Sequence, residues 1–196
     1  MNPLPVTLKG DLVRLEPLTL KHLDDLVKVG LDPEIWAQNP RSIETRKDLE
    51  EYVELALAER ADGKSIPFAI VLKEPGQAIG SSRYGNIDRA NRRLEIGWTW
   101  LGRNWWRTGV NSECKFLLLQ HAFEDLGCVR VELKTDALNE RSRNAMLRIG
   151  AREEGTLRKH MLTASGRWRD TVYYSILDTE WPLVRARLRE MAERHG

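Results

Sequence analysis

The chain has 196 residues, of which 41% are hydrophobic and 31% charged, a composition typical of a globular protein with a substantial core. The formal net charge of +2 argues against nucleic acid as a partner, and no apolar run reaches the roughly 18 residues of a membrane span. We expect a cytoplasmic protein without a metal, because no signal-peptide pattern occurs and two cysteines, Cys114 and Cys128, are too few for a disulfide framework or a zinc site.

The first half of the chain contains patterns for both strands and helices. Alternating apolar residues indicate strands, and apolar residues three or four positions apart indicate helices. In chain order we expect strand segments around a turn at 6–18, a short helix capped by Thr19, an irregular segment at 31–42, a helix at 45–61, and strands at 68–72, 79–87 and 94–101. The helix at 45–61 has the clearest start, since Thr45 and Asp48 match a capping box.

The second half alternates helices and strands. In chain order we expect a helix from about 111 to Gly127, a strand at 129–135, a helix at 139–149, strands at 155–161 and 168–176, and an amphipathic tail helix at 181–195. Gly150 directly follows the helix at 139–149, which is a common position for a helix to stop.

This order of elements predicts a mixed α/β fold. A strand–helix–strand–helix core between pairs of strands is typical of one sheet covered by helices, and not of a barrel or a bundle. We expect about seven strands in a single domain over 1–196, with 181–195 as a C-terminal helical extension. The sequence does not decide whether that helix covers its own core, docks a partner or makes a homodimer contact.

The segment from Asn104 to Glu113 joins an expected strand to an expected helix. The first turn of a helix has unpaired N–H groups and the positive end of the helix dipole, so a loop that leads into it can hold a phosphate. Gly109 permits close backbone approach and Arg107 adds a cation. From spacing alone, an ordinary strand-to-helix connection with Asn111 or Ser112 as N-cap explains the segment better than a phosphate site does.

Two stretches resemble a known family. Glu95-Ile-Gly-Trp-Thr-Trp100 followed by Trp106-Arg-Thr-Gly-Val-Asn-Ser-Glu113 resembles the acetyl-CoA motif of GCN5-related N-acetyltransferases, in particular the RimJ/RimL-like branch. The stretch from Asn139 to Gly155 resembles the same branch, with Asn139, Ser142 and Gly150 at motif positions. Trp106 and Asn111 depart from the family's Gln/Arg and Gly/Ala. The loop's backbone amides, which hold the pyrophosphate in the family, tolerate such changes.

The resemblance implies a fold and a donor site. The sheet would be mostly antiparallel with a splayed central pair, and acetyl-CoA or another acyl-CoA would be the co-substrate. In the family, the strand before the loop binds the acyl and pantetheine groups. The donor contacts expected from this resemblance are Trp98, Thr99, Trp100, Arg107, Thr108, Gly109, Val110, Asn111, Asn139 and Ser142. Trp98 and Trp100 would lie on one face of their strand and Thr99 on the other.

The family reaction is attack of an amine on a thioester, which requires loss of an amine proton and stabilisation of the leaving thiolate. By resemblance, Ser142 would assist the thiolate and Glu95 would be the general base, with Glu132 and Asp136 as alternative bases. Many family members use a tyrosine acid where this chain has Met146, so that route is excluded here.

The acceptor would be a protein N-terminus or a small-molecule amine, and we expect Trp36, Trp98 and Tyr84 to contact it. Three alternatives remain open. The chain could use a longer acyl-CoA, could bind acyl-CoA as a non-catalytic sensor on the same fold, or could be an interaction domain that uses its tail helix.

Overall fold

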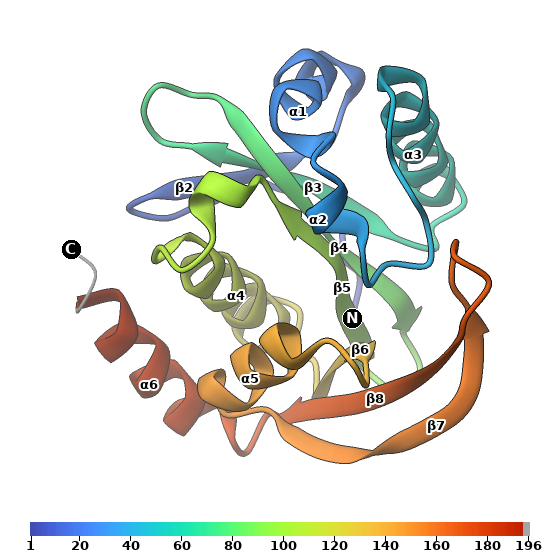
Figure 1. Ribbon diagram of the computed structural model, residues 1–196. Helices are drawn as coiled ribbons and strands as arrows, with labels where there is room; N and C mark the ends of the chain where they lie inside the picture. Colours follow the sequence, from blue (N-terminus) through green and yellow to red (C-terminus); the bar gives the residue numbers. More distant parts are fainter. Residues whose placement is uncertain (194–196) are drawn as a thin grey trace.

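The computed structural model describes residues 1–193 and contains one eight-stranded sheet with helices on both faces (Figure 1). The strands lie in the order β1-β2-β3-β4-β5-β6-β8-β7. Their bounds are β1 Leu8–Lys9, β2 Val13–Pro17, β3 Ile66–Leu72, β4 Ala78–Asp88, β5 Arg93–Leu101, β6 Arg130–Asp136, β7 Arg152–Leu162 and β8 Trp168–Leu177. All neighbouring strands are antiparallel except β5 and β6, which are parallel.

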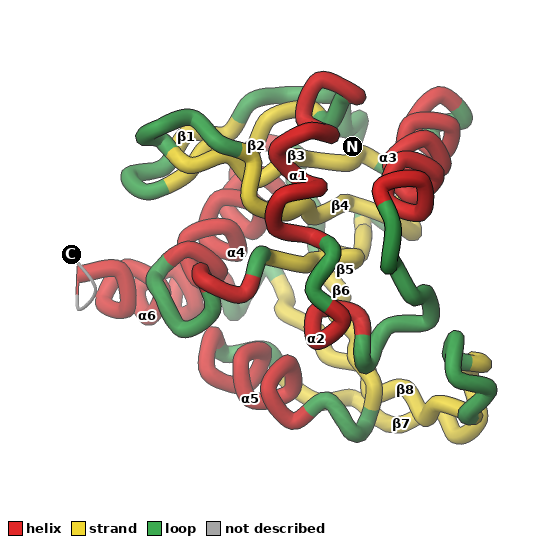
Figure 2. The backbone as a smooth tube through the Cα atoms, turned by 45° about the horizontal axis from the view of Figure 1, so that its top comes forward, coloured by secondary structure: helices red, strands yellow, loops and turns green. Residues whose placement is uncertain are grey.

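Helices cover the two faces of the sheet in two groups (Figures 1 and 2). Their bounds are α1 Leu23–Gly30, α2 Pro33–Trp36, α3 Arg46–Ala61, α4 Val110–Gln120, α5 Glu140–Ile149 and α6 Trp181–Glu193. One core cluster joins the sheet to α1, α2 and α3 through side chains such as Leu26 and Leu49. A second joins the opposite face to α4 and α6 through Leu118 and Leu188. None of the described helices is long and apolar enough to cross a membrane.

The expected elements are largely present, with three differences. The strand region at 6–18 forms two strands, so the sheet has eight strands where about seven were expected. The segment at 31–42 is not wholly irregular, because Asp32 caps the short helix α2 and Pro33 occupies its first position. The tail helix is described up to Glu193, and its expected end at His195 lies outside the described residues.

The tail helix α6 belongs to the core of this fold. Trp181, Val184 and Leu188 are each at most 6% exposed and pack in the same cluster as α4. Trp181 also stacks on Phe123, with ring centroids 5.5 Å apart. These residues recur at helical spacing, so the apolar face that the sequence predicts is covered by the protein's own core.

The parallel strands β5 and β6 separate soon after they meet. Their register covers only Arg93–Glu95 against Arg130–Glu132, although β5 continues to Leu101 and β6 to Asp136. This is the expected splayed pair. Beyond it, each strand has backbone groups without a ladder partner on the side that faces the other strand.

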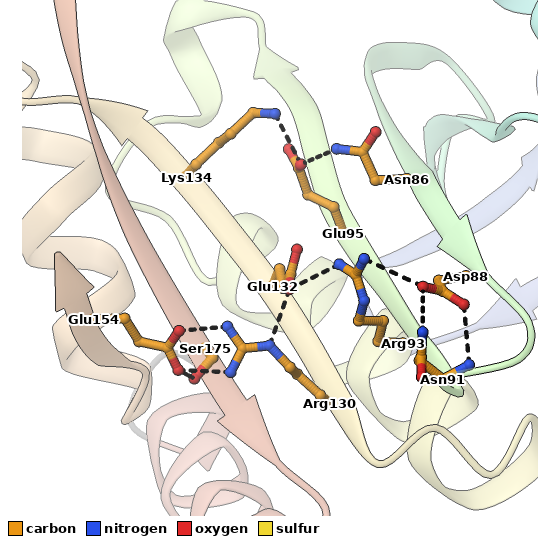
Figure 3. Close-up of polar contacts among 10 residues, drawn as sticks. All are labelled: Asn86, Asp88, Asn91, Arg93, Glu95, Arg130, Glu132, Lys134, Glu154 and Ser175. Carbon is orange, nitrogen blue, oxygen red and sulfur yellow. Dashed lines mark hydrogen bonds and ion pairs between the residues drawn. The ribbon is translucent and has the colours of Figure 1, made fainter. Parts of the chain in front are cut away.

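A ladder of polar side chains holds the closed end of this gap (Figure 3). Lys134 and Asn86 both bond one oxygen of Glu95, at 2.9 and 2.7 Å. Further along, Oε1 of Glu132 forms ion pairs with Nη1 of Arg93 at 3.1 Å and with Nε of Arg130 at 2.9 Å. Because these contacts link β4, β5 and β6, they stabilise the short parallel contact from which the gap opens.

Strand β5 contains a β-bulge at Trp98 and Thr99. Between the pairs Ser81–Trp100 and Arg83–Gly97, one residue of β4 faces two residues of β5, Trp98 and Thr99. Trp98 has a φ of 50°, the left-handed conformation that bulges and turns use.

Close backbone packing beside this bulge makes Gly80 on β4 sensitive to substitution. A Cβ atom at Gly80 would lie 2.2 Å from the carbonyl oxygen of Trp100, which is backbone and cannot rotate away. We expect Gly80→Ala to lower the free energy of unfolding by about 3 kcal/mol, measured by urea denaturation. Gly166→Ala is the control, because its Cβ would meet nothing within 4 Å and only its φ of +80° costs energy, about 1 kcal/mol. Equal losses in the two variants would contradict the steric argument.

Candidate active site

A cavity of about 330 Å³ lies in the gap between β5 and β6. Its walls come from β5, the loop before α4, the first turns of α4 and α5, the end of β6 and the segment after α2. The cavity is lined by eight of the residues expected from the sequence: Glu95, Trp98, Thr99, Trp100, Arg107, Asn111, Asn139 and Ser142. Segments far apart in the chain therefore meet at the point where the sheet splits.

The bulge places the β5 side chains as expected. Trp98 is 39% exposed and lies near Arg83 and Lys134, with each cation 5.8 Å from its ring. Trp100 is 5% exposed and packs with α1, α2 and α3, whereas Thr99 points to the opposite face, toward α4. One tryptophan thus belongs to the core, and the other borders the cavity with an exposed ring.

The loop before α4 has its tight turn at Arg107 and not at the glycine. Gly109 has φ −62° and ψ −16°, which any residue adopts, whereas Arg107 has φ 63°. The helix begins at Val110 with Gly109 as N-cap and no side-chain cap, so neither Asn111 nor Ser112 is the N-cap. Gly109 is nevertheless buried at the helix start.

Free backbone donors converge at this helix start. Within residues 1–193, the backbone N–H groups of Gly109, Asn111 and Ser112 donate no hydrogen bond. The N–H of Val110 has only a weak contact with Thr108 Oγ1 at 3.4 Å. Such donors, together with the positive end of the helix dipole, can hold an anion, and we call this helix start, residues 107–112, the anion site.

Two arginines and a tryptophan flank the anion site. The guanidinium of Arg141 lies 3.5 Å from the ring centroid of Trp106, and the indole Nε1 of Trp106 donates to the carbonyl of Leu101 at 3.0 Å. Burial lowers the pKa of Arg141, and the nearby charge of Arg107 lowers it further. Trp106 therefore braces the loop, as expected, and holds one cation beside another at the cavity entrance.

The first turn of α4 is tied to the N-terminal hairpin. The carboxylate of Glu113 accepts the N–H groups of Asp11, Leu12 and Val13 at 2.7–2.9 Å. Gly10 makes this approach possible, because a Cβ there would lie 2.6 Å from the Glu113 carboxyl carbon. The negative charge is thus directed away from the anion site and offset by three donors.

Glu95 is a buried carboxylate with one oxygen free. It is 2% exposed and lines the cavity, and Lys134 and Asn86 both bond Oε2 (Figure 3). Oε1 accepts no hydrogen bond from any described residue. The two alternative bases are engaged elsewhere: Glu132 by two arginines, and Asp136 by Arg167 and the N–H of Leu138.

The start of α5 faces the cavity from the other side. Asn139 is the N-cap of α5, since its Oδ1 accepts the N–H of Ser142 at 3.0 Å. Ser142 and Met146, one turn apart, both line the cavity. Ser142 is consequently the hydroxyl that α5 presents to the gap.

Several expected contacts lie elsewhere. Tyr84 is 1% exposed and its hydroxyl donates to the carbonyl of Leu118 at 2.6 Å, so it is a core residue and we do not retain it as an acceptor contact. Trp36 packs behind Trp100 and donates to the carbonyl of Gly30, so it shapes the wall only indirectly. Thr108, Gly109 and Val110 do not line the cavity, although Arg107 and Asn111 on either side of them do.

Three cations in the cavity wall were missed from the sequence: Lys115, Lys134 and Arg169. Arg169 is 6% exposed, and burial lowers its pKa. Lys115 follows Asn111 by four positions on α4, so it shares the face of that helix that meets the cavity. This spacing, a lysine among apolar helix residues, was the signal available in the sequence.

Comparison with known proteins identifies a family domain over the part of the chain that contains most of the cavity lining. A model of the acetyltransferase (GNAT) domain matches residues 13–152, which include the whole β2–α5 region around the gap. The chain belongs to the GNAT family of acetyltransferases. Among curated proteins, the uncharacterized N-acetyltransferase p20 of Bacillus licheniformis is 29% identical to this chain over 176 residues. The match covers 89% of this chain and 98% of that protein.

Solved GNAT structures share the fold over nearly the full chain. A GCN5-related N-acetyltransferase from Brucella melitensis has a TM-score of 0.89 at 33% identity and covers 97% of this chain and 86% of that one. RimJ of Mycobacterium smegmatis, solved in complex with CoA-disulfide, has a TM-score of 0.82 at 24% identity over 95% and 94% of the two chains. Within residues 1–193, no group of three or more His, Cys, Asp or Glu side chains is placed to hold a metal ion.

The strained position at Arg107 allows a test of whether this residue contributes to CoA binding. We expect Arg107→Gly to raise the free energy of unfolding by about 1 kcal/mol, because glycine adopts a φ of 63° without strain. The same variant should bind CoA about tenfold more weakly in calorimetry, because a charged donor to phosphate is lost. Arg107→Ala is the control, with the same loss of affinity and no gain in stability. An unchanged dissociation constant in both variants would remove Arg107 from the phosphate site.

Proposed function

We propose that this chain transfers the acetyl group of acetyl-CoA to a primary amine by direct attack in a ternary complex. One observation carries the proposal. One cavity is lined by Arg107 and Asn111, beside the start of α4, and also by the buried Glu95 in the gap between β5 and β6. A donor with phosphates at one end and a thioester at the other fits such a path.

The residues present fit the phosphate end of CoA. The N–H groups at the start of α4 and the cations of Arg107 and Arg141 have no ion-pair or strong hydrogen-bond acceptor among residues 1–193, as a pyrophosphate site requires. The pantetheine arm would then pass Asn111 and Asn139 and reach the bulge at Trp98 and Thr99.

Glu95 is our proposed general base. Its free oxygen, Oε1, would accept the amine proton directly or through one water molecule, while Lys134 and Asn86 hold the other oxygen in position. The amine nitrogen then bonds to the acyl carbon as the carbon–sulfur bond breaks.

Ser142 is our proposed donor to the leaving thiolate. It faces the gap from α5, one turn before the methionine that replaces the family's tyrosine. Its hydroxyl can donate a hydrogen bond to the sulfur as negative charge develops there.

We propose an amine-bearing acceptor that enters from the face of Trp98, between the segment after α2 and the β7–β8 hairpin. Gln38 and Asn39 line the cavity there, and Arg167 of the hairpin contacts Gln38 at 3.5 Å. A protein N-terminus is supported by YdaF of Bacillus subtilis (strain 168), provisionally named a ribosomal N-acetyltransferase, which is 33% identical over 146 residues. A small-molecule amine fits the same entrance.

Release of free thiol from acetyl-CoA tests the proposal, with a panel of small amines and peptides with free N-termini as acceptors. We expect at least one amine to give a rate above hydrolysis and an acetylated product by mass spectrometry. Binding of CoA without turnover by any amine would support the sensor alternative, which the methionine at 146 favours. Failure to bind CoA in calorimetry would reject both functions.

A further inference from the structure

Lys115 is a buried cation in the cavity that the reaction as described does not use. It lies on α4, is 8% exposed and lines the gap between β5 and β6. Its Nζ donates to Thr99 Oγ1 at 2.9 Å, and that oxygen also bonds Ser82 Oγ at 2.8 Å. The ammonium therefore lies directly beside the bulge.

No described residue gives Lys115 a carboxylate partner. Glu95 is the acid whose charge affects it, but the Glu95 carboxylate forms no ion pair with Lys115 and bonds Lys134 through Oε2 at 2.9 Å. Burial lowers the pKa of Lys115 to about 8, so the group is still mostly charged at neutral pH. By contrast, the fully buried Arg83 has a carboxylate partner, Glu59, at 3.0 Å. A desolvated charge with one hydroxyl as its partner is unfavourable unless a ligand supplies the opposite charge.

The position of Lys115 along the cavity identifies the part of the donor it would meet. It lies one turn beyond Asn111 on α4, so it is further into the gap than the phosphate site. In the proposed orientation of the donor, with the phosphates at the start of α4, the acyl group is the part next to the bulge. Lys115 therefore faces the acyl chain from the side opposite the acceptor, because Thr99 points toward α4 and Trp98 away from it.

We propose that the preferred donor is an acyl-CoA whose acyl chain ends in a carboxylate, as in malonyl- or succinyl-CoA, and that Lys115 forms an ion pair with that carboxylate. This inference rests on the proposed acyl transfer, keeps its site and chemistry, and replaces acetyl-CoA by a carboxylate-ended acyl-CoA as the preferred donor. The transfer is otherwise unchanged: the amine bonds to the thioester carbon, the carbon–sulfur bond breaks, and the thiolate takes up one proton while the amine loses one. The terminal carboxylate stays ionised and passes to the product amide.

Donors of matched length test the proposal. Dissociation constants for acetyl-, butyryl- and succinyl-CoA are measured by calorimetry, because butyryl and succinyl chains have the same number of carbons and differ in the terminal charge. We expect the wild-type protein to bind succinyl-CoA at least about tenfold more tightly than butyryl-CoA. Lys115→Met, which keeps the length of the side chain, should abolish that preference and leave the affinity for acetyl-CoA within about threefold. Thiol release with an active amine should show the same order in kcat/KM.

The outcomes separate the two proposals. Equal binding of succinyl- and butyryl-CoA by the wild-type protein, or an equal loss for all donors in Lys115→Met, overturns the role of Lys115 and leaves acetyl transfer intact. Failure of the wild-type protein to bind any acyl-CoA overturns the proposed function and this inference together. Thermal melting checks that Lys115→Met is folded, and Lys115→Gln provides the same comparison if it is not.

Discussion

Glu95→Gln is expected to lower kcat by about 100-fold or more, with the dissociation constant of acetyl-CoA changed less than about twofold. The amide has nearly the same shape and can still accept from Lys134 and Asn86 through its oxygen, so the cavity should keep its form. It cannot take a proton from the attacking amine. Steady-state thiol release and calorimetry on the same preparation measure the two quantities.

Glu132→Gln is the matched control for Glu95→Gln. Glu132 lies opposite Glu95 in the β5–β6 register and belongs to the same polar ladder, but it bonds Arg93 and Arg130 and does not line the cavity (Figure 3). We expect it to change stability slightly and kcat by less than about threefold. Equal losses of kcat in the two variants would mean that the ladder acts only through structure, and Glu95 would no longer be the base.

Ser142→Ala is expected to lower kcat by about 100-fold while CoA binding stays within about twofold, because a donor to developing charge acts mainly in the transition state. The backbone N–H of Ser142 would still bond Asn139 Oδ1, so the start of α5 should be unaffected. Stopped-flow detection of the free thiol in a single turnover measures the chemical step.

Ser142→Thr is the control for the hydroxyl, since threonine keeps the donor and adds only a methyl group. We expect it to recover most of the rate that Ser142→Ala loses. If the alanine variant turns over at the wild-type rate, Ser142 has no part in thiolate departure and the route to a protonated thiol must lie elsewhere in the cavity.

The elements of this fold were predictable wherever neighbouring residues determine them. The capping box of Thr45 and Asp48 starts α3, and Gly150 with a φ of 100° ends α5, both as the sequence indicates. The sequence order and the resemblance also pointed to the gap, the anion site and the residues Glu95 and Ser142. The capping box and the glycine stop act within a few positions along the chain, so they do not depend on the rest of the fold.

The chemistry of the cavity depended on contacts between distant segments. The pair of Lys115 with Thr99, the ion pair of Lys134 with Glu95 and the core position of Tyr84 each join residues that no local pattern relates. The bulge at Trp98 and the left-handed turn at Arg107 are backbone choices that local preference disfavours. Only tertiary packing supplies the energy that holds such conformations, and only tertiary packing decides whether a charged side chain finds a partner or is left to a ligand.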